Sequence, residues 1–186
     1  MTRVLVTGFE PFGEHATNPS ALLAKSFDGV VLPVSYARAG DALRAAIEDA
    51  DPDVVLCFGL ADTDTAISVE RFAHNIQEVD AIDNDGAPGS GAEIDPAGPL
   101  ALRSSLPVDE IVAALRDEGI PANVSRDAGG YLCNHIFYVL MQTLDPKTIG
   151  GFIHVPPASV IPPDDLVRAA GVIVAACKRA ALARQK

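Results

Sequence analysis

The 186-residue sequence contains no tryptophan and few basic residues. Only 14 Lys and Arg stand against 25 Asp and Glu, which gives a formal net charge of −11. Nucleic acids and anionic membrane surfaces need a basic protein surface to neutralise phosphate, so this charge balance argues against both as partners. A small molecule or a peptide is the kind of partner that the composition favours.

Cysteine is also scarce, with Cys57, Cys133 and Cys177 at scattered positions inside apolar segments. An odd number without regular spacing is not a disulfide framework, so we expect a reducing, cytoplasmic environment. The three cysteines and four histidines show no metal-ligand spacing, and we expect neither a metal nor a cofactor.

Long apolar runs are missing as well. No run approaches the ~20 residues of a membrane-spanning helix, and the N-terminus has no signal-peptide pattern. We therefore expect a soluble, unprocessed protein that does not enter the membrane.

Apolar residues nevertheless make up 48% of the chain, enough for one substantial core, and we expect a single domain over residues 1–186. Strand-like and helix-like patterns alternate along the chain, which is typical of an α/β fold. The expected strands are 4–6, 30–34, 54–59, 67–74, 122–125 and a short one within 150–157. The expected helices are one ending at 26, then 39–50, 108–118, one beginning near 133, and 164–183.

Cys133 lies where one of these helices should begin. Gly129 and Gly130 precede an apolar run to residue 141, so we expect Cys133 in the first turn. A helix N-terminus favours thiolate over thiol and can hold a developing oxyanion. Cys133 is therefore either a nucleophile or a small buried core residue.

Two residues are candidate partners for this thiol. His154 lies near a strand end in an otherwise apolar run, where imidazole serves as a catalytic base or as a hydrogen-bonded core group. His135, only two residues from Cys133 on the same helix, cannot readily reach the sulfur. Glu70 is flanked by apolar residues and is either half of a salt bridge or a member of a site.

Phe9 and Phe12 lie in the segment that follows the first strand. Segments after parallel strands line the ligand crevice of open α/β sheets, so both rings either wall an apolar subsite or fold back onto the core. The segment 80–99 is rich in Gly, Pro and Asp and is long for a connection, which makes it a candidate lid or subunit contact.

Several ordered blocks together resemble the pyroglutamyl peptidase family of cysteine peptidases. They are residues 6–13 with 18–20, Glu70-Arg71, Asp83-Asn84, Gly98-Pro99, 119–121, 128–129 with 133–135, and 150–154. The resemblance implies a three-layer αβα fold with a twisted, mixed, mostly parallel central sheet. It also implies no metal or cofactor, and assembly into homodimers or homotetramers.

The resemblance further implies removal of an N-terminal pyroglutamyl residue from peptides by a triad of Glu70, Cys133 and His154. It places Phe9 and Phe12 on either side of the pyrrolidone ring. We also expect Asn18, Leu60 and Asn134 to lie near the substrate.

Two positions depart from the common family pattern. Leu60 replaces a side-chain amide and Asp80 replaces a cation, so we expect both to bear on substrate affinity and site electrostatics. Two alternatives follow: a cysteine amidase of altered acyl specificity on the same fold, and a non-catalytic peptide-binding relative.

Overall fold

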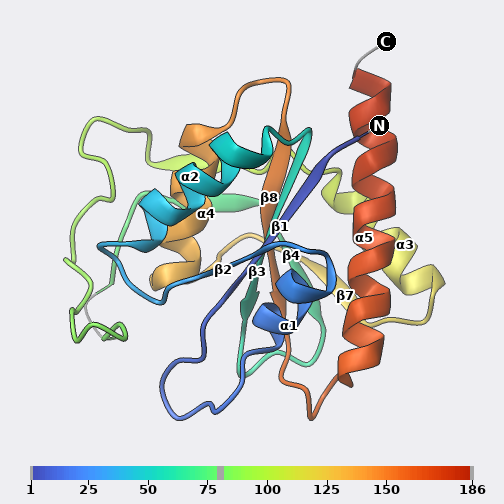
Figure 1. The fold of residues 1–186 in the computed structure, drawn as a ribbon, viewed down its shortest axis with the longest axis horizontal. Coiled ribbons are helices and arrows are strands. Elements are labelled where there is room, and N and C mark those ends of the chain that lie inside the picture. The colour runs from blue at the N-terminus through green and yellow to red at the C-terminus, as the bar shows by residue number, and fades with distance from the viewer. Residues whose placement is uncertain (1, 79–81, 185–186) are drawn as a thin grey trace.

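The computed structural model describes residues 2–78 and 82–184, which form a twisted sheet between two layers of helices (Figure 1). The strands of this sheet are β1 (Val4–Phe9), β2 (Val30–Leu32), β3 (Val54–Leu60), β4 (Ile67–Glu70), β7 (Ala122–Ser125) and β8 (Ile149–Val155). The helices are α1 (Pro19–Ser26), α2 (Ala39–Ala50), α3 (Val108–Asp117), α4 (Leu132–Thr143) and α5 (Pro163–Arg184). No helix within the described residues has both the length and the apolar character needed to cross a membrane.

The six strands lie in the order β2-β1-β3-β8-β4-β7. The first four are parallel, β4 runs antiparallel to β8, and β7 is parallel to β4. Every residue of β3 and β8 is buried, as expected for central strands covered on both faces. The sheet therefore changes direction once, between β8 and β4.

The helices divide between the two faces of the sheet. One core cluster joins α1, α3 and α5 to the sheet, and a second joins α2 and α4 to it. Figure 1 shows α3 and α5 together on the right and α2 and α4 on the left. The predicted α/β fold, a single domain with three αβα layers and a mixed, mostly parallel sheet, is confirmed.

The segment 67–74 differs from its prediction as one strand, because it changes sheets at Arg71. Glu70 ends β4 in the main sheet, whereas β5 (Phe72–His74) pairs with β6 (Ala101–Arg103). Arg71 bonds through its backbone to both neighbours, donating to the Ser125 carbonyl and accepting from the Ser104 amide. An alternating pattern predicts extended backbone but contains no signal for a change of partner strand.

Helix α1 begins at a cap that also fixes the preceding segment. Asn18 Oδ1 accepts hydrogen bonds from the backbone N–H and the hydroxyl of Ser20, at 3.0 and 2.8 Å. Asn18 Nδ2 donates to the Glu10 carbonyl at 3.0 Å, and the Ser20 hydroxyl accepts from the Phe9 N–H. Asn18 is 4% exposed, and its side-chain hydrogen bonds join the start of α1 to the segment after β1.

Asn18→Ala should therefore lower the free energy of unfolding by about 2 kcal/mol, because it removes an N-cap and leaves a backbone carbonyl unpaired. Urea denaturation of the purified protein measures this change. Asn18→Ser keeps a capping oxygen and should lose less. Equal stability of the alanine variant and the unmodified protein would contradict the assigned role.

Candidate active site

Cys133 is the second residue of α4 and lies in its first turn, as predicted. The N-cap residue Tyr131 is extended and makes no side-chain capping hydrogen bond. Gly129, with φ of +77°, adopts a left-handed backbone that L side chains rarely take, and it turns the chain toward the helix. The half-buried thiol of Cys133 is thus next to uncapped N–H groups and the positive end of the helix dipole.

The sulfur of Cys133 lies directly over Gly59 of β3. A Cβ atom added at Gly59 would come within 2.8 Å of Cys133 Sγ and 2.7 Å of the Phe152 ring. Such distances are shorter than van der Waals contact, so the absence of a side chain at residue 59 makes room for the thiol. No local pattern predicts this requirement, because the contact joins residues far apart in the chain.

His154 and Glu70 form a buried hydrogen-bonded pair across the β8–β4 junction. His154 lies opposite Ser68 in the antiparallel register, and Glu70 points from the same face of β4 as Ser68. His154 Nδ1 is 2.8 Å from Glu70 Oε1, with the residues 8% and 1% exposed. The carboxylate therefore orients the imidazole and stabilises its N–H at Nδ1.

The protonation of His154 is set by this environment. Burial by itself lowers the pKa of an imidazole, but here the charge and hydrogen bonding of Cys133 and then of Glu70 outweigh it and raise the pKa of His154 to about 10. The raised pKa indicates that the imidazole of His154 is protonated at neutral pH, with its Nδ1 2.8 Å from Glu70 Oε1.

Cys133 and His154 both line a cavity of about 180 Å³, named here the Cys133 pocket. Its other lining residues are Phe9, Phe12, Val34, Leu60, Asp62, Ala128, Tyr131 and Leu132. Most of this wall is apolar, as in sites for small neutral groups. Phe9 is only 3% exposed, so it belongs to the core and to the pocket wall at once.

A family model described as pyroglutamyl peptidase matches residues 2–183. The pyrrolidone-carboxylate peptidase of Clavibacter michiganensis is 44% identical over 168 residues, which cover 84% of this chain and 79% of that relative. The chain belongs to the pyroglutamyl peptidase family.

Solved structures agree with this membership. The pyrrolidone carboxyl peptidase from Thermococcus litoralis superposes with a TM-score of 0.91 at 35% identity, covering 100% of this chain and 97% of that one. The pyroglutamyl peptidase I of Bacillus amyloliquefaciens superposes with a TM-score of 0.90 at 33% identity, covering 95% and 97%. The chain is thus a hydrolase of the pyroglutamyl peptidase I type.

Two residues expected near the substrate, Asn18 and Asn134, have side chains that are bonded to backbone groups of the protein. Asn18 caps α1 and does not line the Cys133 pocket. Asn134 is fully buried, where it accepts from the His74 N–H and donates to the carbonyls of His74 and Ile76. Its side chain is occupied by these bonds, so only its backbone N–H remains for an oxyanion.

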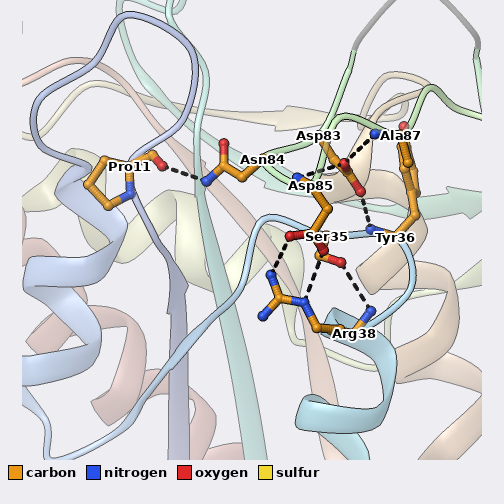
Figure 2. A network of polar contacts seen from close by, with 8 residues as sticks. All are labelled: Pro11, Ser35, Tyr36, Arg38, Asp83, Asn84, Asp85 and Ala87. Atoms are coloured by element: carbon orange, nitrogen blue, oxygen red, sulfur yellow. Dashed lines mark hydrogen bonds and ion pairs between the residues drawn. The ribbon is translucent and has the colours of Figure 1, made fainter.

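The segment 82–87, named here the clamp loop, turns around the carboxylate of Asp83 (Figure 2). Asp83 Oδ1 accepts from the backbone N–H of Asp85 and Ala87, at 3.0 and 2.8 Å. Its Oδ2 accepts from the Tyr36 N–H at 2.8 Å. Asp83 is 5% exposed, so its carboxylate is buried with three hydrogen-bond donors. These bonds attach the clamp loop to Tyr36, which lies just before α2.

The clamp loop is bonded to two residues of the pocket wall, Val34 and Tyr131, and to Pro11 next to Phe12. The Asn84 N–H donates to the Val34 carbonyl at 2.9 Å. Asn84 Nδ2 donates to the Pro11 carbonyl at 2.9 Å (Figure 2). The Tyr131 hydroxyl donates to the Ile82 carbonyl at 3.1 Å. The predicted choice between lid and subunit contact for 80–99 stays open, and Asp80 lies outside the described residues.

An exposed ion pair adds little to this attachment. Arg38 donates to both carboxylate oxygens of Asp85, at 3.0 and 2.8 Å, and holds the pKa of Asp85 below its usual range (Figure 2). Both side chains are exposed to solvent, where such pairs stabilise weakly. The buried bonds of Asp83 therefore fix the loop.

The histidines His15 and His74 bond to groups other than Cys133 and Glu70. His15 lies 2.8 Å from Asp62, both partly exposed at the rim of the Cys133 pocket. His74 Nε2 lies 3.0 Å from the Arg126 carbonyl. Among the described residues no cluster of three His, Cys, Asp or Glu side chains is arranged to hold a metal ion.

His135 faces away from the pocket and is kept neutral by its surroundings. Ser90 donates two hydrogen bonds to Gln77 Oε1, which leaves Gln77 Nε2 to donate to His135 Nδ1 at 2.7 Å. Burial first, and then the charge of Arg44, lower the pKa of His135 to about 4. Protonation would place a second donor against the Gln77 amide.

His135 binds a proton near pH 6.5 in the unfolded chain but only near pH 4 in the folded protein. Lowering the pH through this window should therefore favour unfolding. The loss assigned to His135 is about 3 kcal/mol, from 1.36 kcal/mol for each pKa unit. Urea denaturation at pH 7 and pH 4 measures it. His135→Gln should show a smaller loss, and an unchanged difference would refute the assignment.

Gly59→Ala should reduce kcat on a pyroglutamyl arylamide about 100-fold, because displacement of a nucleophile by about 1 Å has effects of that order. Circular dichroism reports whether the variant keeps its fold. Gly171→Ala is the matched control, because a Cβ there meets no atom within 4 Å. Full activity of Gly59→Ala would show that the sulfur position is not set by this contact.

Proposed function

We propose that Cys133, His154 and Glu70 form the catalytic triad with which this pyroglutamyl peptidase hydrolyses the amide bond after an N-terminal pyroglutamyl residue. The observation that carries the proposal is the buried Glu70–His154 hydrogen bond beside a helix-terminal thiol in one apolar pocket. A core cysteine would have no need of a charged, oriented imidazole next to it.

The reaction begins with proton transfer from Cys133 Sγ to His154 Nε2. The raised pKa of His154 favours this imidazolium–thiolate state, and Glu70 accepts the hydrogen bond from Nδ1–H. The thiolate attacks the acyl carbon of the pyroglutamyl residue to form a tetrahedral oxyanion. His154 then donates its Nε2 proton to the leaving nitrogen, and the C–N bond breaks.

The second half of the reaction releases the acyl group. The pyroglutamyl residue is held as a thioester on Cys133, and a water molecule enters beside His154. Nε2 takes a proton from the water as its oxygen attacks the thioester carbon. The C–S bond breaks, pyroglutamic acid leaves, and the thiolate and imidazolium are regenerated.

The oxyanion is assigned to backbone N–H groups of the first turn of α4. Tyr131 supplies no side-chain cap, and the Asn134 side chain is bonded elsewhere, so only the backbone of residues 132–134 remains for this role. One such donor typically contributes about 3 kcal/mol to transition-state stabilisation.

The Cys133 pocket suits a neutral ring. Pyroglutamyl carries no ammonium group, so its site needs apolar walls, here Phe9, Phe12 and Leu60, and hydrogen bonds to a lactam. Asp62 also borders the pocket, but it lies 2.8 Å from His15 and is engaged there. An aliphatic Leu60 adds to the apolar wall.

We further propose that the chain acts in the cytoplasm on N-terminally pyroglutamylated peptides and assembles into a homodimer or homotetramer. Three exposed apolar side chains, Ile76, Ile82 and Leu100, lie on or next to the long segment that Figure 1 shows beside α2 and α4. Exposed apolar groups of this kind are typical of subunit contacts. A free nucleophilic thiol is preserved in a reducing compartment.

The specificity is tested by offering pyroglutamyl, prolyl and glutaminyl arylamides to the same enzyme. Pyroglutamyl should be cleaved fastest. Prolyl has a protonatable amine and no lactam carbonyl, so groups that pair with the lactam are left unpaired at about 1–3 kcal/mol each. Glutaminyl is open and cationic and fits poorly between Phe9 and Phe12.

Cys133→Ser supplies the baseline for this assay and should show no substantial turnover, whereas Cys177→Ser should remain active because Cys177 is a buried residue of the α5 core. Turnover by Cys133→Ser would refute the triad. Equal or faster cleavage of the prolyl substrate would refute the specificity and favour an amidase of another acyl preference.

A further inference from the structure

The face of β4 and β7 opposite α3 is polar. Ile67 and Val69 of β4 pack in the core with α3, so the alternate residues Ser68 and Glu70 point to the other face. The register continues this polar surface across β7, where Ser68 lies opposite Asn123 and Glu70 lies opposite Ser125. The chief helix contacts of β4 and β7 are with α3, on the apolar side.

This polar surface forms the floor of a cavity of about 480 Å³, named here the β4–β7 cavity. Its lining residues are Ala61, Asp64, Ser68, Glu70, Asn123, Ser125, Asp127, Ala128, Gly129 and His154. Three of them are carboxylates, and none is Lys or Arg. The cavity is therefore acidic, in contrast to the apolar Cys133 pocket.

One of the carboxylates is unsatisfied. Glu70 is 1% exposed and uses Oε1 for His154, while its Oε2 is buried without a hydrogen-bond partner among the residues that the structure describes. Buried carboxylate oxygens are normally paired, so an unpaired one in the cavity wall adds to the negative potential there. Asp64 accepts only the Ser68 hydroxyl, and Asp127 accepts the Gly129 N–H.

His154 separates the two cavities, and Ala128 lines both as well. In the proposed reaction the acyl group occupies the Cys133 pocket, and the leaving nitrogen must lie next to His154 to receive its proton. The peptide beyond that nitrogen therefore extends past His154, away from the acyl group. The β4–β7 cavity lies on that side.

We propose that the β4–β7 cavity receives the residue that follows the pyroglutamyl group and favours a cationic side chain there. This inference rests on the proposed function and adds a substrate class to it: peptides that begin with pyroglutamyl followed by lysine or arginine. Asp64 and Asp127 are the specificity-determining residues, because both can approach a long basic side chain without taking part in the chemistry.

The test compares kcat/KM for three pyroglutamyl tripeptide amides that differ only in the second residue: lysine, glutamine or glutamate. We expect lysine to exceed glutamine and glutamine to exceed glutamate, with a lysine-to-glutamate ratio of about 10 at low ionic strength. Partly exposed ion pairs are each worth roughly a factor of 1.5 to 5, and the swap reverses two of them. Half-molar salt should reduce the ratio, because it screens exposed charges.

The double variant Asp64→Asn, Asp127→Asn should bring the ratio to within about twofold of unity. Asparagine keeps the oxygen that accepts from Ser68 or Gly129, and a ratio does not depend on the fraction of folded enzyme. Asp49→Asn is the control, since this exposed residue lies near the end of α2 that leads into the start of β3, whereas His154 lies near the carboxyl end of the neighbouring parallel strand β8. It should leave the ratio near 10.

Three results would overturn the inference. A wild-type ratio near unity, with a pyroglutamyl arylamide still cleaved, refutes the acidic subsite and leaves the proposed function standing. A ratio that survives the double variant, or falls equally with Asp49→Asn, places the preference in the net charge of the protein. Failure to cleave any pyroglutamyl substrate refutes the proposed function itself.

Discussion

The buried pair of Glu70 and His154 joins the two strands at which the sheet changes direction. A carboxylate that is 1% exposed would be strongly disfavoured as an anion without a partner, and the imidazole at 2.8 Å supplies one. The antiparallel junction of β4 and β8 makes the pair possible, because it brings Glu70 beside the end of a strand that otherwise belongs to a parallel set. The raised pKa of His154 depends in turn on its interactions with Cys133 and with Glu70.

Patterns local in the sequence predicted the fold well. The bounds of α2 were predicted at 39–50 and those of β7 at 122–125, as the structure has them, because apolar period and flanking breakers act within a few residues. The change of sheet at Arg71 and the three-residue strand β6 were missed, since both depend on which distant strand is available as a partner. The Glu70, Cys133 and His154 assignments drew on strand ends, a helix start and the family resemblance together.

Side-chain amides were the least predictable part of the site. Asn18 and Asn134 lie in motifs shared with the family, and a motif does not distinguish an amide that binds substrate from one that holds backbone. The structure shows both amides bonded to neighbouring peptide groups. Asp83 in the clamp loop is a comparable case, because its three backbone donors come partly from Tyr36, 47 residues away. Such bonds fix the backbone around the pocket and involve partners that are distant in the sequence.

The two faces of the sheet differ in polarity. On the α1, α3 and α5 side, strands and helices bury a continuous apolar core, which leaves no room for polar chemistry. On the other side α2 and α4 cover the parallel strands, while β4 and β7 present a row of polar residues beside the N-terminus of α4. His154 and Ala128 line both the apolar Cys133 pocket and the acidic β4–β7 cavity, so the two cavities meet at the imidazole. In the proposed reaction this position would put an apolar wall on one side of His154 and an acidic wall on the other.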